Sequence, residues 1–249
     1  MKMNLGMSSE KVLPQKTLSN PVASESDPIG DALRTDCMAY WKLDETSGTR
    51  VDATGRGNNL DPINSPPGVV GKIGNAVRAS TDPNRYLQAA QRTDDITFGD
   101  VTYTHVCWIK IRDLEASQEI TYNDDTIGFQ WDGSFSYSFS SVAIQFGAGE
   151  DTQSAETFGA ISQDVWYFCV GVYDSEQNAI KISINGGVFD SYVLGYSPNQ
   201  ADGNFWIGFP SEFGFCDVDV DELGFWKRLL SQDEIDYLYN SGTGRTLYP

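Results

Sequence analysis

Carboxylates alternate with valines in the segment Phe215-Cys216-Asp217-Val218-Asp219-Val220-Asp221-Glu222. A period of two predicts a strand with Asp217, Asp219 and Asp221 on one face and the valines in a core. Paired carboxylates hydrolyse glycosides, but a retaining pair needs its carboxyl groups about 5–5.5 Å apart. Strand positions i and i+4 lie about 13 Å apart, which short aspartates do not bridge. The spacing of the cluster therefore disfavours a glycoside hydrolase.

His105 is the single histidine of the chain, so a Ser-His-Asp or Cys-His catalytic site would have to use it. It lies within the apolar alternating segment Tyr103–Ile111, which predicts a structural histidine in the core. No glycine-rich phosphate loop and no His-Glu-x-x-His motif is present. The sequence therefore predicts a binding or structural protein rather than an enzyme.

Exposed aromatic rings are the other candidate chemistry, because rings on a sheet can stack against sugar faces. The candidates for such a platform are Trp131, Tyr137, Tyr192, Tyr196 and Trp206. Aromatic residues in strands also fill cores, and this alternative stays open.

The charge balance limits the possible partners. Seventeen Lys and Arg face 35 Asp and Glu, a formal net charge of −18, which disfavours nucleic acid and anionic membranes. No run approaches the ~20 apolar residues of a membrane span, and the N-terminus lacks secretory-signal features. We expect synthesis in a cytoplasm. The four cysteines form no Cys-x-x-Cys pair, which argues against zinc, and we expect Cys107 and Cys169 to be reduced and buried.

Strand patterns dominate after Met38. Both faces of Tyr103–Ile111 are apolar, which predicts a strand inside a sheet. Asn185-Gly186 predicts a tight hairpin joining Ile180–Ile184 to Val188–Val193, because both turn positions tolerate positive φ. The other predicted strands are Phe135–Phe139, Ala143–Phe146, Val165–Tyr173, Phe205–Phe209 and Val218–Trp226.

One helix is predicted near the C-terminus. Ser231 and Glu234 form a capping box, Ile235, Leu238 and Tyr239 share an apolar stripe, and Gly242 ends the helix. Many strands with one short helix predict an all-β fold of two antiparallel sheets packed face to face.

The first 36 residues differ from the rest of the chain, with three prolines, many serines and no periodic apolar pattern. We assign residues 1–36 to an extended N-terminal arm and residues 37–249 to the β-sandwich domain. The segment is either a disordered tail or an arm that orders on a partner. Its candidate anchors are Leu5, Met7, Val12, Leu13 and Leu18.

Taken in order, several segments resemble the concanavalin A-like lectin/glucanase, laminin-G-like jelly-roll family, which occurs in phage virion and adhesion proteins. The segments, from roughly residue 38 to 243, are AYWKLDETSGTRVDATGRGNN, GVVGKIGNAVRAS, TDPNRYLQAA, YTHVCWIKI, WYFCVGVYD, IKISINGGV and VDELGFWKRLLSQDEIDYLYNSG. Each motif is weak alone, and their order makes them specific for the fold. The fold hosts many functions and does not select one.

The resemblance implies a two-sheet jelly-roll sandwich and a structural Ca²⁺. The positions that it suggests as ligands are Asp44, Asp52, Asp82, Asp221 and Glu222. Alternatively, these residues cap turns through backbone hydrogen bonds.

Three functions remain as hypotheses. The first is a virion structural protein of a tailed phage (decoration, fibre or spike), anchored on other virion proteins by the arm and displaying a lectin-like sandwich to host glycans. The second is a lectin or adhesion module outside a virion, in an extracellular location. The third, a glycoside hydrolase, is disfavoured by the carboxylate spacing. A homo-oligomer suits the first hypothesis, since spikes are often symmetric.

Overall fold

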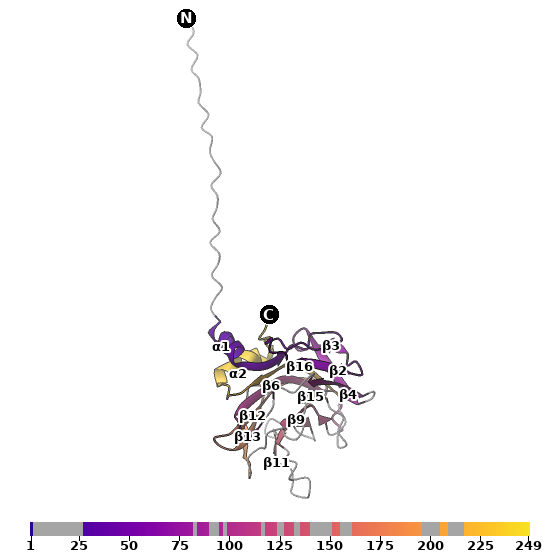
Figure 1. Cartoon of the computed structure of the whole chain (residues 1–249), viewed down its shortest axis with the longest axis vertical. Helices are drawn as coiled ribbons and strands as arrows, with labels where there is room; N and C mark the ends of the chain where they lie inside the picture. Colours follow the sequence, from indigo (N-terminus) through magenta and orange to yellow (C-terminus); the bar gives the residue numbers. More distant parts are fainter. Residues whose placement is uncertain are drawn as a thin grey trace.

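The computed structural model describes residues 1, 27–81, 84–89, 95–96, 99–115, 118–123, 127–131, 135–139, 151–154, 161–195, 205–208 and 217–249. These residues form an antiparallel β-sandwich with helices on one outer face (Figure 1). The predicted all-β, two-sheet jelly-roll class is confirmed.

The first sheet, sheet A, has the order β3-β4-β16-β6-β12-β13-β14, and β1 pairs with the second half of β16. Its strands are β1 (Cys37–Trp41), β3 (Gly68–Val70), β4 (Asn75–Thr81), β6 (Tyr103–Ile111), β12 (Trp166–Asp174), β13 (Ala179–Ile184), β14 (Asp190–Val193) and β16 (Asp217–Trp226). The predicted interior strand β6 indeed lies between β16 and β12.

The second sheet, sheet B, has the order β2-β5-β15-β8-β9-β10-β11, with β7 also paired to β9. Its strands are β2 (Leu60–Ile63), β5 (Asn84–Ala89), β7 (Gln118–Glu119), β8 (Thr121–Asn123), β9 (Ile127–Trp131), β10 (Phe135–Phe139), β11 (Asp151–Ser154) and β15 (Phe205–Ile207). The pairing of β4 with β5 links the two sheets. The predicted strand Ala143–Phe146 lies outside the described residues.

Two apolar cores lie on the two faces of sheet A. Between the sheets, Cys107 and Ile109 of β6 pack with Phe129 and Phe205 of sheet B. On the other face, Val106 and Trp108 belong to a second core beneath the helices. The chain is thus layered as helices, sheet A and sheet B, which explains why both faces of β6 are apolar.

The predicted C-terminal boundary of the arm, residue 36, is wrong. Pro28–Asp36 forms helix α1, which begins at an Asp27 N-cap with proline in its first turn. Leu33 is fully buried in the second core, and the indole Nε1 of Trp226 donates to its carbonyl at 2.9 Å. Burial of the Leu33 side chain therefore stabilises α1, which is too short to be a stable helix on its own. The five predicted arm anchors lie outside the described residues.

Helix α2 (Gln232–Tyr239) begins with the predicted capping box of Ser231 and Glu234. It ends earlier than predicted, because Asn240 already adopts the left-handed conformation (φ 48°), and the 3-10 turn η3 (Asn240–Gly242) follows. The predicted turn at Asn185-Gly186 is confirmed, with φ of 55° and 69°, and β13 pairs with β14. The hairpin is longer than predicted, because β14 begins at Asp190 and its first pair is Ile182 with Asp190.

The described cysteines Cys37, Cys107 and Cys169 are buried free thiols, and burial raises the pKa of each. Neither helix of the described residues is long and apolar enough to cross a bilayer.

Candidate functional site

A β-bulge in strand β16 determines the direction of two acidic side chains, Asp221 and Glu222. The pairing of β16 with β6 shifts register between Asp221 and Gly224, and Glu222 has φ of 48°. Asp221 pairs with Trp108, and Glu222 lines a small cavity with the same Trp108. The bulge therefore turns two consecutive carboxylates toward the helix-covered face.

Asp221 is fully buried and accepts backbone amides at Oδ2, from Lys72 N at 2.8 Å and Ile73 N at 2.9 Å. Burial raises the pKa of Asp221 to about 8, with further contributions from the charges of Glu222 and Asp44. Its other oxygen, Oδ1, is buried without a hydrogen-bond partner among the described residues. A buried carboxylate with an orphan oxygen favours the neutral acid, as the raised pKa reflects.

Glu222 is 4% exposed and accepts a hydrogen bond at Oε2 from the Tyr40 hydroxyl. Burial raises its pKa to about 7, although the Tyr40 and Thr246 hydroxyls favour the charged form. The Tyr40 oxygen in turn accepts the Leu247 amide at 3.3 Å, which ties the C-terminal segment over the carboxyl group.

The other acidic residues of strand β16 form ion pairs with basic side chains. Val218 and Val220 face the intersheet core as predicted. On the other face, Asp217 pairs with Arg78 at 2.8 Å and Asp219 with Lys110 at 2.8 Å. The cavity beside Glu222 holds only about 10 Å³, which excludes a sugar substrate.

His105 is 1% exposed and stacks on Phe225, with ring centroids 4.2 Å apart. Burial lowers its pKa well below the usual value, so the ring is a neutral part of the core. The predicted structural role of this histidine is confirmed.

Four of the five calcium-ligand candidates, Asp44, Asp52, Asp221 and Glu222, lie in the part of the chain that the structure describes. Asp52 uses both carboxylate oxygens: Oδ1 accepts Thr54 N of its own loop and Tyr40 N of β1, and Oδ2 accepts Asn58 N. Asp82 lies outside the described residues. Within the described part of the chain, no three Asp, Glu, His or Cys side chains converge as metal ligands. Asp52 is therefore a turn cap, and calcium binding stays a prediction.

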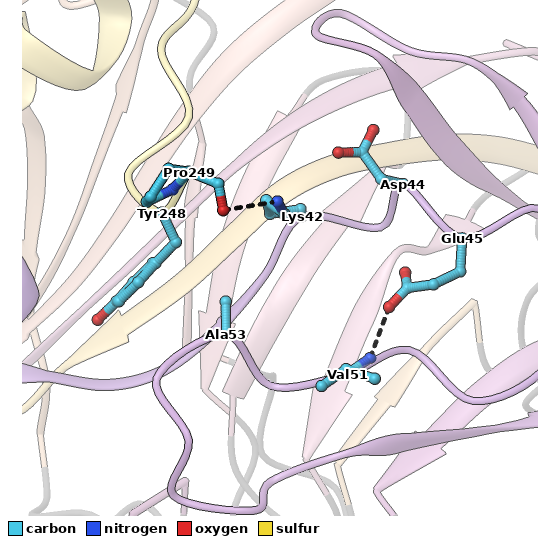
Figure 2. Close-up of a pocket in the computed structure, with 7 residues that line it drawn as sticks. All are labelled: Lys42, Asp44, Glu45, Val51, Ala53, Tyr248 and Pro249. Carbon is cyan, nitrogen blue, oxygen red and sulfur yellow. Dashed lines mark hydrogen bonds between the residues drawn. The ribbon is translucent and has the colours of Figure 1, made fainter.

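An open pocket of about 430 Å³ lies where the loop after β1 meets the C-terminal segment (Figure 2). Its lining residues are Lys42, Asp44, Glu45, Val51, Ala53, Tyr248 and Pro249. Figure 2 shows the two carboxylates on one side of this pocket and the Tyr248 ring on the other. We call it the loop pocket.

Hydrogen bonds fix the polar wall of the loop pocket. Asp44 accepts the Asn75 amide at Oδ1 (2.8 Å), and Glu45 accepts the Val51 amide at Oε1 (2.8 Å). The Lys42 ammonium donates to the carbonyl of Pro249 at 3.2 Å. Each carboxylate thus has one oxygen bound to the fold, and both side chains are half-buried.

The aromatic wall is equally fixed. Tyr248 packs against Tyr40, with ring centroids 5.3 Å apart, and its hydroxyl donates to the Arg34 carbonyl at 3.2 Å. Arg34 also donates to the Leu247 carbonyl at 3.0 Å. Helix α1 therefore holds the ring that faces the pocket.

Two rings of the predicted aromatic platform, Tyr192 and Trp206, have side chains that the structure describes. Tyr192 is 42% exposed and pairs with the core residue Ile180 at the edge of sheet A. Trp206 is 7% exposed, and it lies between the core residues Phe205 and Ile207, so it points away from the intersheet core.

These two rings therefore belong to different faces. Trp131 and Tyr137 lie in β9 and β10 with side chains outside the described set, and Tyr196 lies outside the described residues.

Sequence reasoning missed most of the loop pocket. Only Asp44 was among its candidates, and it was assigned to a metal. The available signal was the cluster of Asp, Gly and Asn residues in 44–59, a long loop of the kind that carries function. Nothing in the sequence indicated that Tyr248 would lie opposite it.

A family model described as the concanavalin A-like lectin/glucanases superfamily matches residues 82–236, and the chain belongs to this superfamily. A comparison with curated proteins gave no match.

Among solved structures, the chain is similar to the binding domain of Paraclostridial Mosquitocidal Protein 1, at 18% identity and a TM-score of 0.67, covering 84% of this chain and 53% of that one. It is also similar to the botulinum neurotoxin serotype D ligand binding domain in complex with N-acetylneuraminic acid, at 13% identity and a TM-score of 0.62, covering 85% and 52%. The chain spans about half of these structures, and at such identity the likeness shows the fold.

Proposed function

We propose that this protein is a non-catalytic carbohydrate-binding module whose site is the loop pocket. The observation that carries the proposal is a pocket of about 430 Å³ with an aromatic ring on one side and hydrogen-bonded carboxylates on the other. Sugars are recognised by this combination, in which a ring stacks on the apolar face and fixed acceptors take the hydroxyls.

Membership of the lectin/glucanase superfamily supports binding. The titratable groups with the largest upward acid shifts, Asp221 and Glu222, lie outside the loop pocket lining and are almost fully buried. Acids sealed in this way cannot protonate a bound glycoside, which supports a module that binds without cleaving.

A blocking variant tests the proposal. Val51 is 56% exposed and lines the pocket, so Val51→Trp fills it while leaving the core intact. The matched control is Val70→Trp, at an 81% exposed valine of β3 outside the pocket lining. Glycan-array hits of the wild type should be lost in the first variant and kept in the second. An array without any hit, or hits that survive Val51→Trp, would contradict the proposal.

A virion structural role is the second candidate. Residues 28–36 lock onto α2 and Trp226, so a partner bound to the residues before Asp27 would be held firmly against the sandwich. We propose that such a partner is another virion protein, that the module is displayed on the particle, and that its ligands are host-surface glycans. The alternative location is extracellular, without a particle.

Deletion of residues 1–26 tests this role, because it spares α1. The truncated protein should remain folded by circular dichroism and fail to join particles or other partner assemblies. Normal incorporation of the truncated form would exclude the anchoring role and leave glycan binding untouched.

Calcium is proposed only as a structural ion. A rise in Tm on adding Ca²⁺, reversed by EGTA, is the expected result. An unchanged Tm would contradict the proposal of a structural Ca²⁺.

A further inference from the structure

The loop pocket has an uneven charge distribution. Lys42 supplies one positive charge, Asp44 and Glu45 supply two negative charges, and the Lys42 ammonium already donates to the Pro249 carbonyl. The formal charge of the whole chain, −18, adds a long-range field of the same sign. A negatively charged ligand therefore meets repulsion here, and a cation meets attraction.

The two walls of the pocket suit a sugar that carries an ammonium group. The second oxygens of Asp44 and Glu45 can accept its protons, since the first oxygens are held by the Asn75 and Val51 amides. The Tyr248 ring on the opposite side of the pocket can then pack against the apolar face of the sugar. Carboxylates fixed by backbone donors lose little side-chain entropy when a ligand binds, which increases the gain per contact.

We propose that the loop pocket selects sugars that carry a free primary ammonium group, that is, de-N-acetylated amino sugars. The proposal rests on carbohydrate binding at this pocket and adds the charge of the ligand. The ammonium lies at the carboxylates of Asp44 and Glu45, and the pyranose body lies toward Val51, Ala53 and the Tyr248 ring on the opposite side. Acetylation of the amine removes its charge and adds bulk, so it weakens binding.

Three β-1,4-linked tetrasaccharides separate charge from shape: the oligomers of glucosamine, N-acetylglucosamine and glucose. Isothermal titration of the full chain should give about tenfold tighter binding of the glucosamine oligomer than of the glucose oligomer, the contribution of one charge-assisted hydrogen bond. This preference should shrink as the salt concentration rises. It should also disappear when the pH is raised until the ligand amine is neutral.

Isosteric variants assign the preference to the two carboxylates. Glu45→Gln and Asp44→Asn keep an oxygen for the Val51 and Asn75 amides, so both variants should fold normally. Each should weaken binding of the glucosamine oligomer several-fold more than binding of the glucose oligomer, because an amide oxygen still accepts from a hydroxyl but no longer carries the charge that attracts an ammonium. The control is Asp61→Asn, an exposed residue outside the pocket lining that accepts a bond from Thr49 at 3.0 Å.

The outcomes distinguish the two proposals. Equal affinity for the three oligomers, lost in Val51→Trp, would overturn the charge selection and keep carbohydrate binding. A preference for glucosamine that persists in both isosteric variants would overturn the assigned residues. Failure of all three oligomers and of every array glycan would overturn the proposed function itself.

Discussion

Two pairs of consecutive acidic residues, Asp44-Glu45 and Asp221-Glu222, lie in contrasting environments in this fold. The first pair lies on a loop and lines an open pocket, with one oxygen of each carboxylate bound by a backbone amide. The second pair lies in a β-bulge and is almost fully buried, with pKa values raised to about 8 and about 7. Whether an acidic side chain can contact a ligand thus depends on its burial more than on its residue type.

The same comparison separates binding from stability. The first pair is half-buried and lines an open pocket, so a ligand can replace water there. The buried pair holds the loop at 72–73 and the C-terminal segment in place, and its charge is disfavoured by burial. We expect substitutions in the first pair to change affinity and those in the second to change folding.

Asp221→Ala should give the largest effect. The Lys72 and Ile73 amides lose their acceptor, and we expect a loss of about 3–4 kcal/mol in the free energy of unfolding, measured by urea denaturation. The matched change in the first pair is Glu45→Ala. It frees only the Val51 amide, which water can reach, and should lower the free energy of unfolding by less than about 1 kcal/mol. Equal losses would erase the contrast between the pairs.

Glu222 should make stability depend on pH. Between its ordinary pKa of 4.5 and the folded value of about 7, the folded chain keeps a proton that the unfolded chain releases. Stability from this group is therefore highest at low pH and falls as pH rises toward about 7. Glu222→Gln keeps an acceptor for Tyr40, so it should gain about 2–3 kcal/mol over the wild type at pH 8.

At about pH 4 the wild type and Glu222→Gln should be nearly equal in stability, because the glutamate is neutral in both states. Urea midpoints at about pH 4, 6 and 8 measure the difference. A constant difference between the two proteins across this range would contradict the raised pKa.

The smallest effect is expected for Asp44→Asn and Glu45→Gln on folding. Both keep the hydrogen bonds to Asn75 and Val51, so Tm should stay within the small range of neutral surface changes. Differential scanning calorimetry beside the titrations would show affinity changing while stability does not. A large drop in Tm would mean that this pair also supports the fold.

Sequence reasoning predicted the parts whose physics is local. Alternation over Tyr103–Ile111 identified an interior strand, Asn185-Gly186 a hairpin, and Ser231 with Glu234 a helix start. The family resemblance then supplied the sandwich. The N-terminal cap of α1, Asp27-Pro28, is also local, but the helix depends on burying Leu33 against distant Trp226.

The site was less predictable, because it joins segments that are distant in the sequence. Asp44 and Tyr248 line one pocket only after the C-terminal segment folds back over β1. A glutamate at positive φ gives no warning in a one-letter pattern, so the bulge at Glu222 was also missed. The shared face of the β16 aspartates was predicted correctly, but their burial was not predicted.

The hydrogen bonds between Arg34 and residues 247–248 bring the first helix and the last residues of the domain side by side. A short linker could therefore join residue 249 to residue 27, and the exposed turn at Glu176-Gln177 could serve as new termini. Such a circularly permuted protein would keep every strand pairing of both sheets. A label fused to the new termini would lie at the turn between β12 and β13.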